Sequence, residues 1–306
     1  CGGGGGGSGG GPLGAPPSGG VGALSAQLLA DGIPAAWLGR YEGRTFELGA
    51  HDAAALADAF SVALALPDLG GAHEGAEELE APCPALQHAL QMAGRRPRSG
   101  EVRKHGTAAW LASGGRQRLL AEYRRFVRHT VLPLLDPDGC GKCVYQAEPT
   151  IRICLPGGRP AGGPPRADVA RYHQPAEITF WVGLTATEAL LASAPSDDAP
   201  LDTVRLAPGQ CACWWGHRLA YGAAAALAGA RSTVSFDFHA VPWALYRESR
   251  DKSRRSSHDL RLGGYYAVMD AAAYDAQATG TDSIGKTVSS GAEERAAADQ
   301  DHAAND

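Results

Sequence analysis

The chain has 306 residues, a length that is enough for one large domain or two small ones. Hydrophobic residues make up 44% of it, and its formal net charge is −5. This charge balance gives no reason to expect a nucleic acid or an anionic membrane as the main partner. No run of residues approaches the roughly 18 apolar residues that a membrane-spanning helix requires.

Both ends of the chain have compositions typical of disordered segments. The chain begins at Cys1 instead of Met, which indicates a fragment, so its targeting cannot be read and a cytoplasmic location is the default expectation. Residues 1–23 are mostly Gly with Pro and Ser, and residues 271–306 are mainly small or polar. Neither segment can bury enough apolar surface to fold, so we predict a single folded domain over residues 24–270.

Residues 24–136 are predicted to be helical. Residues 52–66 are rich in Ala and Leu and end at Pro67, which cannot continue a helix. Residues 116–135 have apolar side chains at helical spacing and basic side chains mainly on the other side. The sequence therefore predicts two amphipathic helices whose apolar faces pack against the core of the domain.

After residue 136 the period of the apolar residues changes from helical to alternating. Residues 143–243 are predicted to contain short strands bounded by Gly and Pro turns, and residues 244–270 a C-terminal extension. The strands are expected at 151–155, 177–184, 204–206, 210–215 and 231–241. Short strands without helices between them indicate a sandwich or barrel, and helices followed by strands indicate an α+β fold.

Four stretches in this order resemble iron(II)/2-oxoglutarate-dependent dioxygenases. They are Tyr145–Gly157, His173–Trp181 with Leu184 and Thr185, Pro208–Gln210 with Gly216 and Leu219, and Arg231–Phe238. The resemblance covers roughly residues 116–268. It implies a jelly-roll core, also called a double-stranded β-helix or cupin-like fold, with the N-terminal helices packed on it.

The resemblance also implies an iron site built from two histidines and one carboxylate, with the opposite face open to 2-oxoglutarate and oxygen. Asp168 aligns with the carboxylate ligand, but Arg166 stands where the first histidine is expected and Tyr221 where the second is. A protonated guanidinium cannot coordinate iron. His173 and His217 are nearby in sequence, so the hypothesis is a substitute metal site of Asp168, His173 and His217.

For the co-substrate, the resemblance points to Arg231 as the residue that contacts a carboxylate of 2-oxoglutarate. The alternative interpretation is a surface arginine at the start of a strand. Arg152 alternates with Ile151 and Ile153, so we expect it to point into the barrel and pair with Glu177 or Asp237. No residue is assigned a catalytic role.

Three functions remain open at this point. The first is an Fe(II)/2-oxoglutarate-dependent oxygenase that hydroxylates a small-molecule or protein substrate of unknown identity. The second is a pseudoenzyme that serves as a binding or scaffold domain, in which Asp168, His173 and His217 are ordinary polar residues. The third is a decayed or misread gene. The Cys140/Cys143 pair is expected to be incidental thiols in preference to half a zinc site.

Overall fold

The computed structural model describes most of the region that was predicted to fold. The described residues are 33, 39–41, 43–76, 79, 83–95, 109–136, 139–159, 164–194, 198–224, 231–248 and 260–279. The predicted tail over residues 1–23 and the predicted tail beyond residue 279 lie outside them. The chain divides into two compact units, residues 1–269 and 270–306. The second unit begins with helix α9 (Ala271–Thr279), where disorder was predicted, because its Ala-rich sequence has high helix propensity.

The described α-helices of the first unit lie within residues 50–135, and strand β1 (Arg44–Glu47) precedes them in a region where only helices were predicted. They are α3 (Ala50–Leu64), α4 (Ala72–Gly75), α5 (Pro84–Met92), α7 (Gly114–Phe126) and α8 (Leu132–Leu135). Helices α3 and α7 confirm the two predicted helices. A π-helical turn over Val127–Val131 joins α7 to α8. The ring of Pro133 would collide with the carbonyl four residues earlier, and the wider turn relieves this contact without ending the helix.

The strands form two antiparallel sheets, so the fold class is mixed α+β. The first sheet has the order β1-β7-β4-β9-β2-β10, with β3 also paired to β9, and the second has the order β6-β5-β8. Their bounds are β1 Arg44–Glu47, β2 Lys142–Gln146, β3 Thr150–Cys154, β4 Ile178–Gly183, β5 Thr187–Ala192, β6 Leu201–Leu206, β7 Gln210–Trp214, β8 Tyr221–Ala223, β9 Thr233–Pro242 and β10 Tyr266–Asp270.

The chain crosses repeatedly between these two sheets. From β3 in the first sheet it reaches the second at Arg166, which forms an isolated bridge with Tyr221. It then passes through β4 in the first sheet, β5 and β6 in the second, β7 in the first, β8 in the second and β9 in the first. Residues from distant parts of the sequence therefore meet between the sheets.

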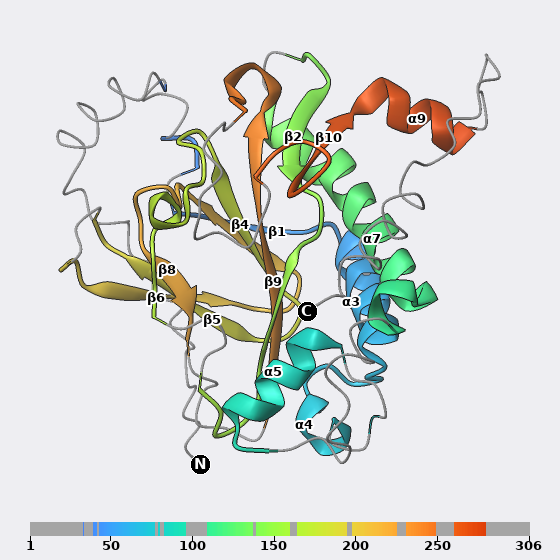
Figure 1. Ribbon diagram of the computed structural model, residues 1–306, viewed down its shortest axis with the longest axis vertical. Coiled ribbons are helices and arrows are strands. Elements are labelled where there is room, and N and C mark those ends of the chain that lie inside the picture. Colours follow the sequence, from blue (N-terminus) through green and yellow to red (C-terminus); the bar gives the residue numbers. More distant parts are fainter. Residues whose placement is uncertain are drawn as a thin grey trace, which may run out of the picture. The chain divides into compact units, whose positions relative to one another are not determined.

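Strand β9 separates two environments, because successive side chains point to opposite faces. Phe236 and Phe238 face the helices, where Phe60 of α3 stacks on Phe236 with ring centroids 4.9 Å apart. Tyr123 of α7 meets the edge of Phe238 at 5.3 Å. Figure 1 shows α3 and α7 side by side next to β9. The opposite face of β9 carries Ser235, Asp237 and His239.

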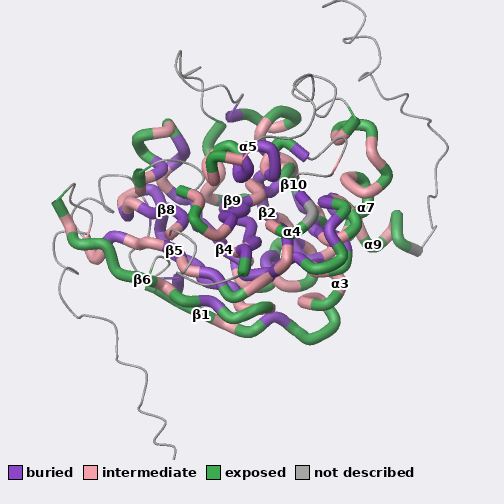
Figure 2. Tube along the Cα trace, turned by 90° about the horizontal axis from the view of Figure 1, so that it is seen from below, coloured by how far each residue is buried: buried purple, intermediate pink, exposed green. Residues whose placement is uncertain are grey.

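A second apolar cluster fills the space between the two sheets. Its fully buried members include Trp181 of β4, Trp214 of β7 and Ala189 of β5, with Tyr221 of β8 2% exposed. In Figure 2 the buried residues are concentrated along β4, β8 and β9, and exposed residues follow β6. The ring of Trp181 also lies 5.4 Å from the guanidinium carbon of Arg152.

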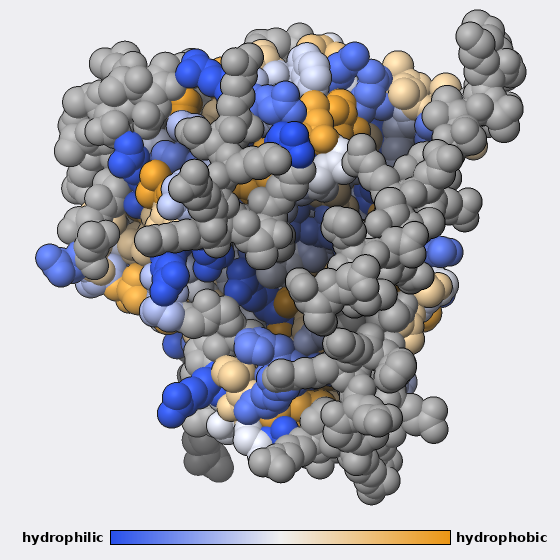
Figure 3. All heavy atoms as spheres, in the orientation of Figure 1, coloured by the Kyte–Doolittle hydropathy of each residue, from blue (hydrophilic) through white to orange (hydrophobic). Residues whose placement is uncertain are grey.

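The exposed side chains on the face in Figure 3 are of mixed character. Among the coloured residues, hydrophobic ones occur in small separated groups between hydrophilic ones. In the described part of the chain, no helix has both the length and the apolar character needed to cross a bilayer.

Candidate metal centre

Asp168, His173 and His239 come together in the first unit. Each offers one ligand atom, and these atoms all lie within 4.8 Å of one another. It is the one group of three or more such residues within the described ranges. The side chains are almost wholly inaccessible, with Asp168 0%, His239 3% and His173 8% exposed. Such a concentration of ionisable groups away from water requires internal partners.

Asp168 is placed by the backbone of the segment before β8. The N–H of Asp168 donates to the carbonyl of Gly216 at 2.8 Å, and the N–H of Val169 to that of His217 at 3.2 Å. A Cβ atom at position 216 would overlap both Thr179 Oγ1 and Asp168 Oδ2. Glycine at 216 therefore allows the Asp168 segment to approach β4.

Three side chains hold the carboxylate of Asp168. Tyr221 Oη donates to Oδ1 at 2.7 Å, and Thr179 Oγ1 donates to Oδ2 at 3.1 Å. His239 Nε2 lies 3.1 Å from Oδ2. Burial alone would raise the pKa of Asp168, but the charge and hydrogen bond of His239, together with Tyr221, hold this pKa well below its usual range.

A short turn brings His173 beside Asp168. The 3₁₀ turn Asp168–Arg171 ends at Tyr172, which has the left-handed φ of 67° that is uncommon for a bulky residue. The N–H of His173 then donates to the carbonyl of Asp168 at 3.2 Å. The imidazole rings of His173 and His239 lie with centroids 4.3 Å apart.

Glu177 holds the outer side of the His173 ring. Its Oε2 lies 2.8 Å from His173 Nδ1, and its Oε1 accepts from the N–H of Gln174 at 3.1 Å. The hydroxyl of Tyr266 also donates to Glu177. Burial would raise the pKa of Glu177, but the charge and hydrogen bond of His173 outweigh burial and lower it. Glu177 thus orients His173 through Nδ1.

His239 is held in the same manner. Its Nδ1 lies 2.9 Å from Tyr265 Oη and 3.1 Å from Gln146 Oε1. Its Nε2 faces Asp168 and Tyr221. Burial would lower the pKa of His239, but Asp168 and then Glu177 outweigh burial and raise it to about 9. Without a metal ion, His239 and Asp168 form a buried ion pair.

A second buried ion pair lies on the same face of β9, two residues before His239. Arg152 Nε donates to Asp237 Oδ1 at 2.5 Å, and its Nη2 donates to Oδ2 at 3.2 Å. This confirms that Arg152 points inward. Of its two predicted partners, Glu177 and Asp237, it is Asp237 that forms the ion pair. Burial would lower the pKa of Arg152, but the charge of Asp237 raises it, so the guanidinium stays charged.

Two of the three predicted ligands, Asp168 and His173, lie together in the structure. The third member of the group is His239 and not His217. His217 is buried, but it does not belong to the group, and its ring lies against Trp215 at 5.9 Å. His239 takes that place because β9 pairs with β4 in the register Thr179↔His239. The alternation that puts His239 on the face of Ser235 and Asp237 was a signal in the sequence. The assignment of His217 as a ligand stays a prediction.

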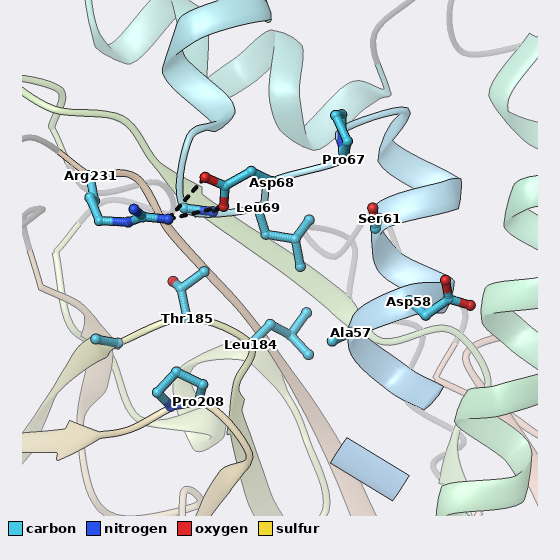
Figure 4. Close-up of a pocket in the computed structure, with 12 residues that line it drawn as sticks. Ala57, Asp58, Ser61, Pro67, Asp68, Leu69, Leu184, Thr185, Pro208 and Arg231 are labelled. Atoms are coloured by element: carbon cyan, nitrogen blue, oxygen red, sulfur yellow. Dashed lines mark hydrogen bonds and ion pairs between the residues drawn. The ribbon is translucent and has the colours of Figure 1, made fainter. Parts of the chain in front are cut away.

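Arg231 lies elsewhere. Its Nη2 donates to both carboxylate oxygens of Asp68 at 3.0 Å, and its side chain is 71% exposed. From Thr233 to His239 the strand spans six residue steps, about 20 Å. Arg231 lines a separate pocket with Leu184, Thr185 and Pro208 (Figure 4). Contact between Arg231 and 2-oxoglutarate stays a prediction, and the geometry does not support it.

The three clustered side chains fit a divalent metal ion by their donor chemistry. Two imidazoles and one carboxylate are the set that holds non-heme iron(II) with open positions. Ligand atoms about 2.1 Å from one ion and at right angles lie roughly 3 Å apart, which matches the 3.1 Å between Asp168 Oδ2 and His239 Nε2. Both histidines bind outer partners through Nδ1, as metal-bound histidines usually do.

Comparisons with known proteins give little further guidance. No protein-family model and no curated protein matches the chain. Two solved structures of the non-heme monooxygenase ThoJ, as a nickel complex and in the apo form, each cover 61% of this chain and 77% of their own. They are 17% and 16% identical with a TM-score of 0.32. An HTH_3 family transcriptional regulator from Vibrio cholerae is 10% identical, covers 62% of this chain and 99% of its own, and has a TM-score of 0.17. Likeness this low carries no argument about function.

Proposed function

We propose that this protein is a non-heme iron oxygenase-like protein whose metal ion is held by Asp168, His173 and His239. The observation that carries the proposal is the closeness of the three ligand atoms, all within 4.8 Å of one another, in a buried site. The outer partners of the two histidines also support it. They contact Nδ1 of each ring, so Nε2 is the nitrogen that remains to bind a metal ion.

The proposed fold of the core is a jelly roll. Its support is the strand order, in which β3, β9, β4 and β7 are neighbours in one sheet and β6, β5 and β8 in the other. The bridge between Arg166 and Tyr221 extends the second sheet by a further short pairing. A chain that alternates between two antiparallel sheets in this way is typical of jelly rolls.

In this proposal the residues of the chain orient the ligands of the ion and set their protonation states. A bound ferrous ion would supply the activation of oxygen. Glu177 fixes the ring of His173, and Tyr265 with Gln146 fixes that of His239. A histidine must be neutral to ligate, so His239 would lose its Nε2 proton when the ion binds. Iron binding should therefore release protons and weaken as the pH falls.

Neither Arg231 nor Arg152 is placed to anchor 2-oxoglutarate at the metal centre. Arg231 is paired with Asp68 away from the cluster, and Arg152 is neutralised by Asp237. Dependence on 2-oxoglutarate rests on the sequence resemblance alone. It is tested by adding 2-oxoglutarate to the iron-loaded protein under air and measuring succinate.

The metal site is tested by anaerobic titration with ferrous iron, followed by calorimetry and metal analysis. We expect one ion per chain, and loss of binding in His239→Ala and Asp168→Ala. His217→Ala is the matched control, because it removes a buried histidine of the neighbouring segment and should retain the ion. Loss of binding in His217→Ala with retention in His239→Ala would refute the assignment.

One observation favours the second candidate, a pseudoenzyme with a binding or scaffold role. Asp168, His239, His173 and Glu177 already satisfy one another through two ion pairs without a metal ion. Arg166 also stands where the resemblance expects the first histidine. Failure of the folded wild-type protein to bind ferrous iron would favour this candidate.

A further inference from the structure

Tyr221 lies within ligand distance of the proposed metal site. Its Oη is 2.7 Å from Asp168 Oδ1 and 3.0 Å from His239 Nε2. These spacings match the roughly 3 Å expected between neighbouring donors around one ion. Tyr221 is only 2% exposed, so its hydroxyl is directed into the site and not to water.

The position of the phenol is fixed by its surroundings. The backbone of Tyr221 pairs in both directions with Arg166, at 3.1 and 3.3 Å. Its ring packs against Trp214 with centroids 5.4 Å apart and meets Trp181 nearly at right angles at 6.4 Å. A ring held between two buried tryptophans cannot turn away without disrupting the core.

We propose that Tyr221 is a fourth ligand of this metal centre, as a phenolate beside Asp168, His173 and His239. The inference rests on the proposed metal site. The phenol proton that now lies between Tyr221 Oη and Asp168 Oδ1 would leave to solvent as the ion takes its place. The resulting set of two imidazoles and two anionic oxygens carries a charge of about −2, which suits ferric iron, a metal that tyrosinate ligates in proteins.

Tyr265 and Tyr266, the tyrosines next to the site, each bind a residue of the centre and therefore cannot serve as controls. Tyr265 Oη contacts Nδ1 of His239, on the opposite side of the ring from Asp168. Tyr266 donates its hydroxyl to Glu177. Tyr41 provides the control, because it is only 2% exposed and its hydroxyl donates to the carbonyl of Leu134. Tyr41→Phe therefore removes a buried hydroxyl of the same kind outside the metal centre.

The test is titration of the full chain with ferric nitrilotriacetate, followed by visible absorption and resonance Raman spectroscopy. We expect one iron per chain, a visible phenolate-to-iron charge-transfer band and enhanced phenolate ring modes in the wild type. Tyr221→Phe should lose the band and should bind iron at least tenfold more weakly than the wild type, and Tyr41→Phe should keep both the band and the affinity.

The outcomes separate this inference from the proposed function. Iron binding without a charge-transfer band, or a band that persists in Tyr221→Phe, overturns only the assignment of Tyr221. Failure of the wild type to bind ferric or ferrous iron overturns both. If Tyr221→Phe does not fold, the Raman spectrum of the wild type decides, because phenolate modes require no variant.

Discussion

The two ends of strand β9 each hold a pair of opposite charges about 3 Å apart, but in opposite environments. Near its C-terminal end, His239 Nε2 lies 3.1 Å from Asp168 Oδ2, with side chains 3% and 0% exposed. Just before its N-terminal end, Arg231 lies 3.0 Å from Asp68, with side chains 71% and 62% exposed. The sequence resemblance assigned Arg231 and Asp168 to one site, but an extended strand separates them.

This difference in burial decides what each pair can do. Exposed charges keep most of their hydration, so their pairing contributes little to stability or to recognition. Buried charges have lost their hydration and depend on every partner that replaces it. The Asp168 end is therefore sensitive to single substitutions and suited to hold an ion, whereas the Arg231 end tolerates change.

The largest effect is expected for Asp168→Ala in the metal-free protein. The substitution leaves the imidazolium of His239 buried without its closest carboxylate, so the free energy of unfolding should fall by about 3–5 kcal/mol. Urea denaturation measures it. Asp68→Ala is the matched control at the other end of β9 and should lose no more than about 1 kcal/mol, because its carboxylate is exposed and accepts hydrogen bonds from the N–H of Gly70 and from the exposed Arg231. Equal losses in the two variants would remove the contrast between the ends.

The next effect is a dependence of stability on pH. The pKa of His239 is raised from 6.5 to about 9, so the metal-free protein gains stability from its charge below pH 6.5 and loses it as the pH rises through about 9. This shift corresponds to roughly 3 kcal/mol. The pKa of Asp168 is lowered, so its contribution is present above its usual range and is lost in acid.

Urea denaturation between pH 6 and pH 10 measures the alkaline loss. His239→Gln cannot titrate, so the difference in unfolding free energy between it and the wild type should shrink as the pH rises. A difference that does not change with pH would contradict the buried ion pair.

A smaller effect is expected for Gly216→Ala. The added methyl group overlaps Thr179 and Asp168, so we expect a loss of about 1–3 kcal/mol from overpacking and weaker binding of ferrous iron. Gly114→Ala is the matched control, because a Cβ at that position of α7 meets nothing within 4 Å. Denaturation and iron titration of both variants measure the effects. Unchanged iron affinity in Gly216→Ala would show that Asp168 can move without loss of the site.

The smallest effect is expected for Arg231→Ala. Its partner Asp68 is exposed, so neither stability nor iron binding should change measurably, and neither should any response to 2-oxoglutarate. Denaturation, iron titration and succinate formation measure these properties. Loss of a 2-oxoglutarate response in this variant alone would support the assignment made from sequence and contradict the separation seen along β9.

Much of the secondary structure could be predicted because its signals are local. The helices over 50–64 and 114–135 follow from apolar spacing, and β3, β4, β7 and β9 from alternation. Strand β5 was missed because its residues Thr187–Ala192 include Glu, Ala and Leu, which favour helices. Pairing with β6 and β8 overrides that preference, and no local pattern contains this information.

The sequence by itself determined the α+β class and the proximity of Asp168 and His173, since the two residues lie only five positions apart across one turn. Only the tertiary structure decided that His239 completes the group, that Tyr221 faces Asp168 and that Arg231 lies away from them. The reason is strand register. Pairing of β9 with β4 places His239 opposite Thr179, which itself donates to Asp168. A shift by one residue would turn His239 toward the helices.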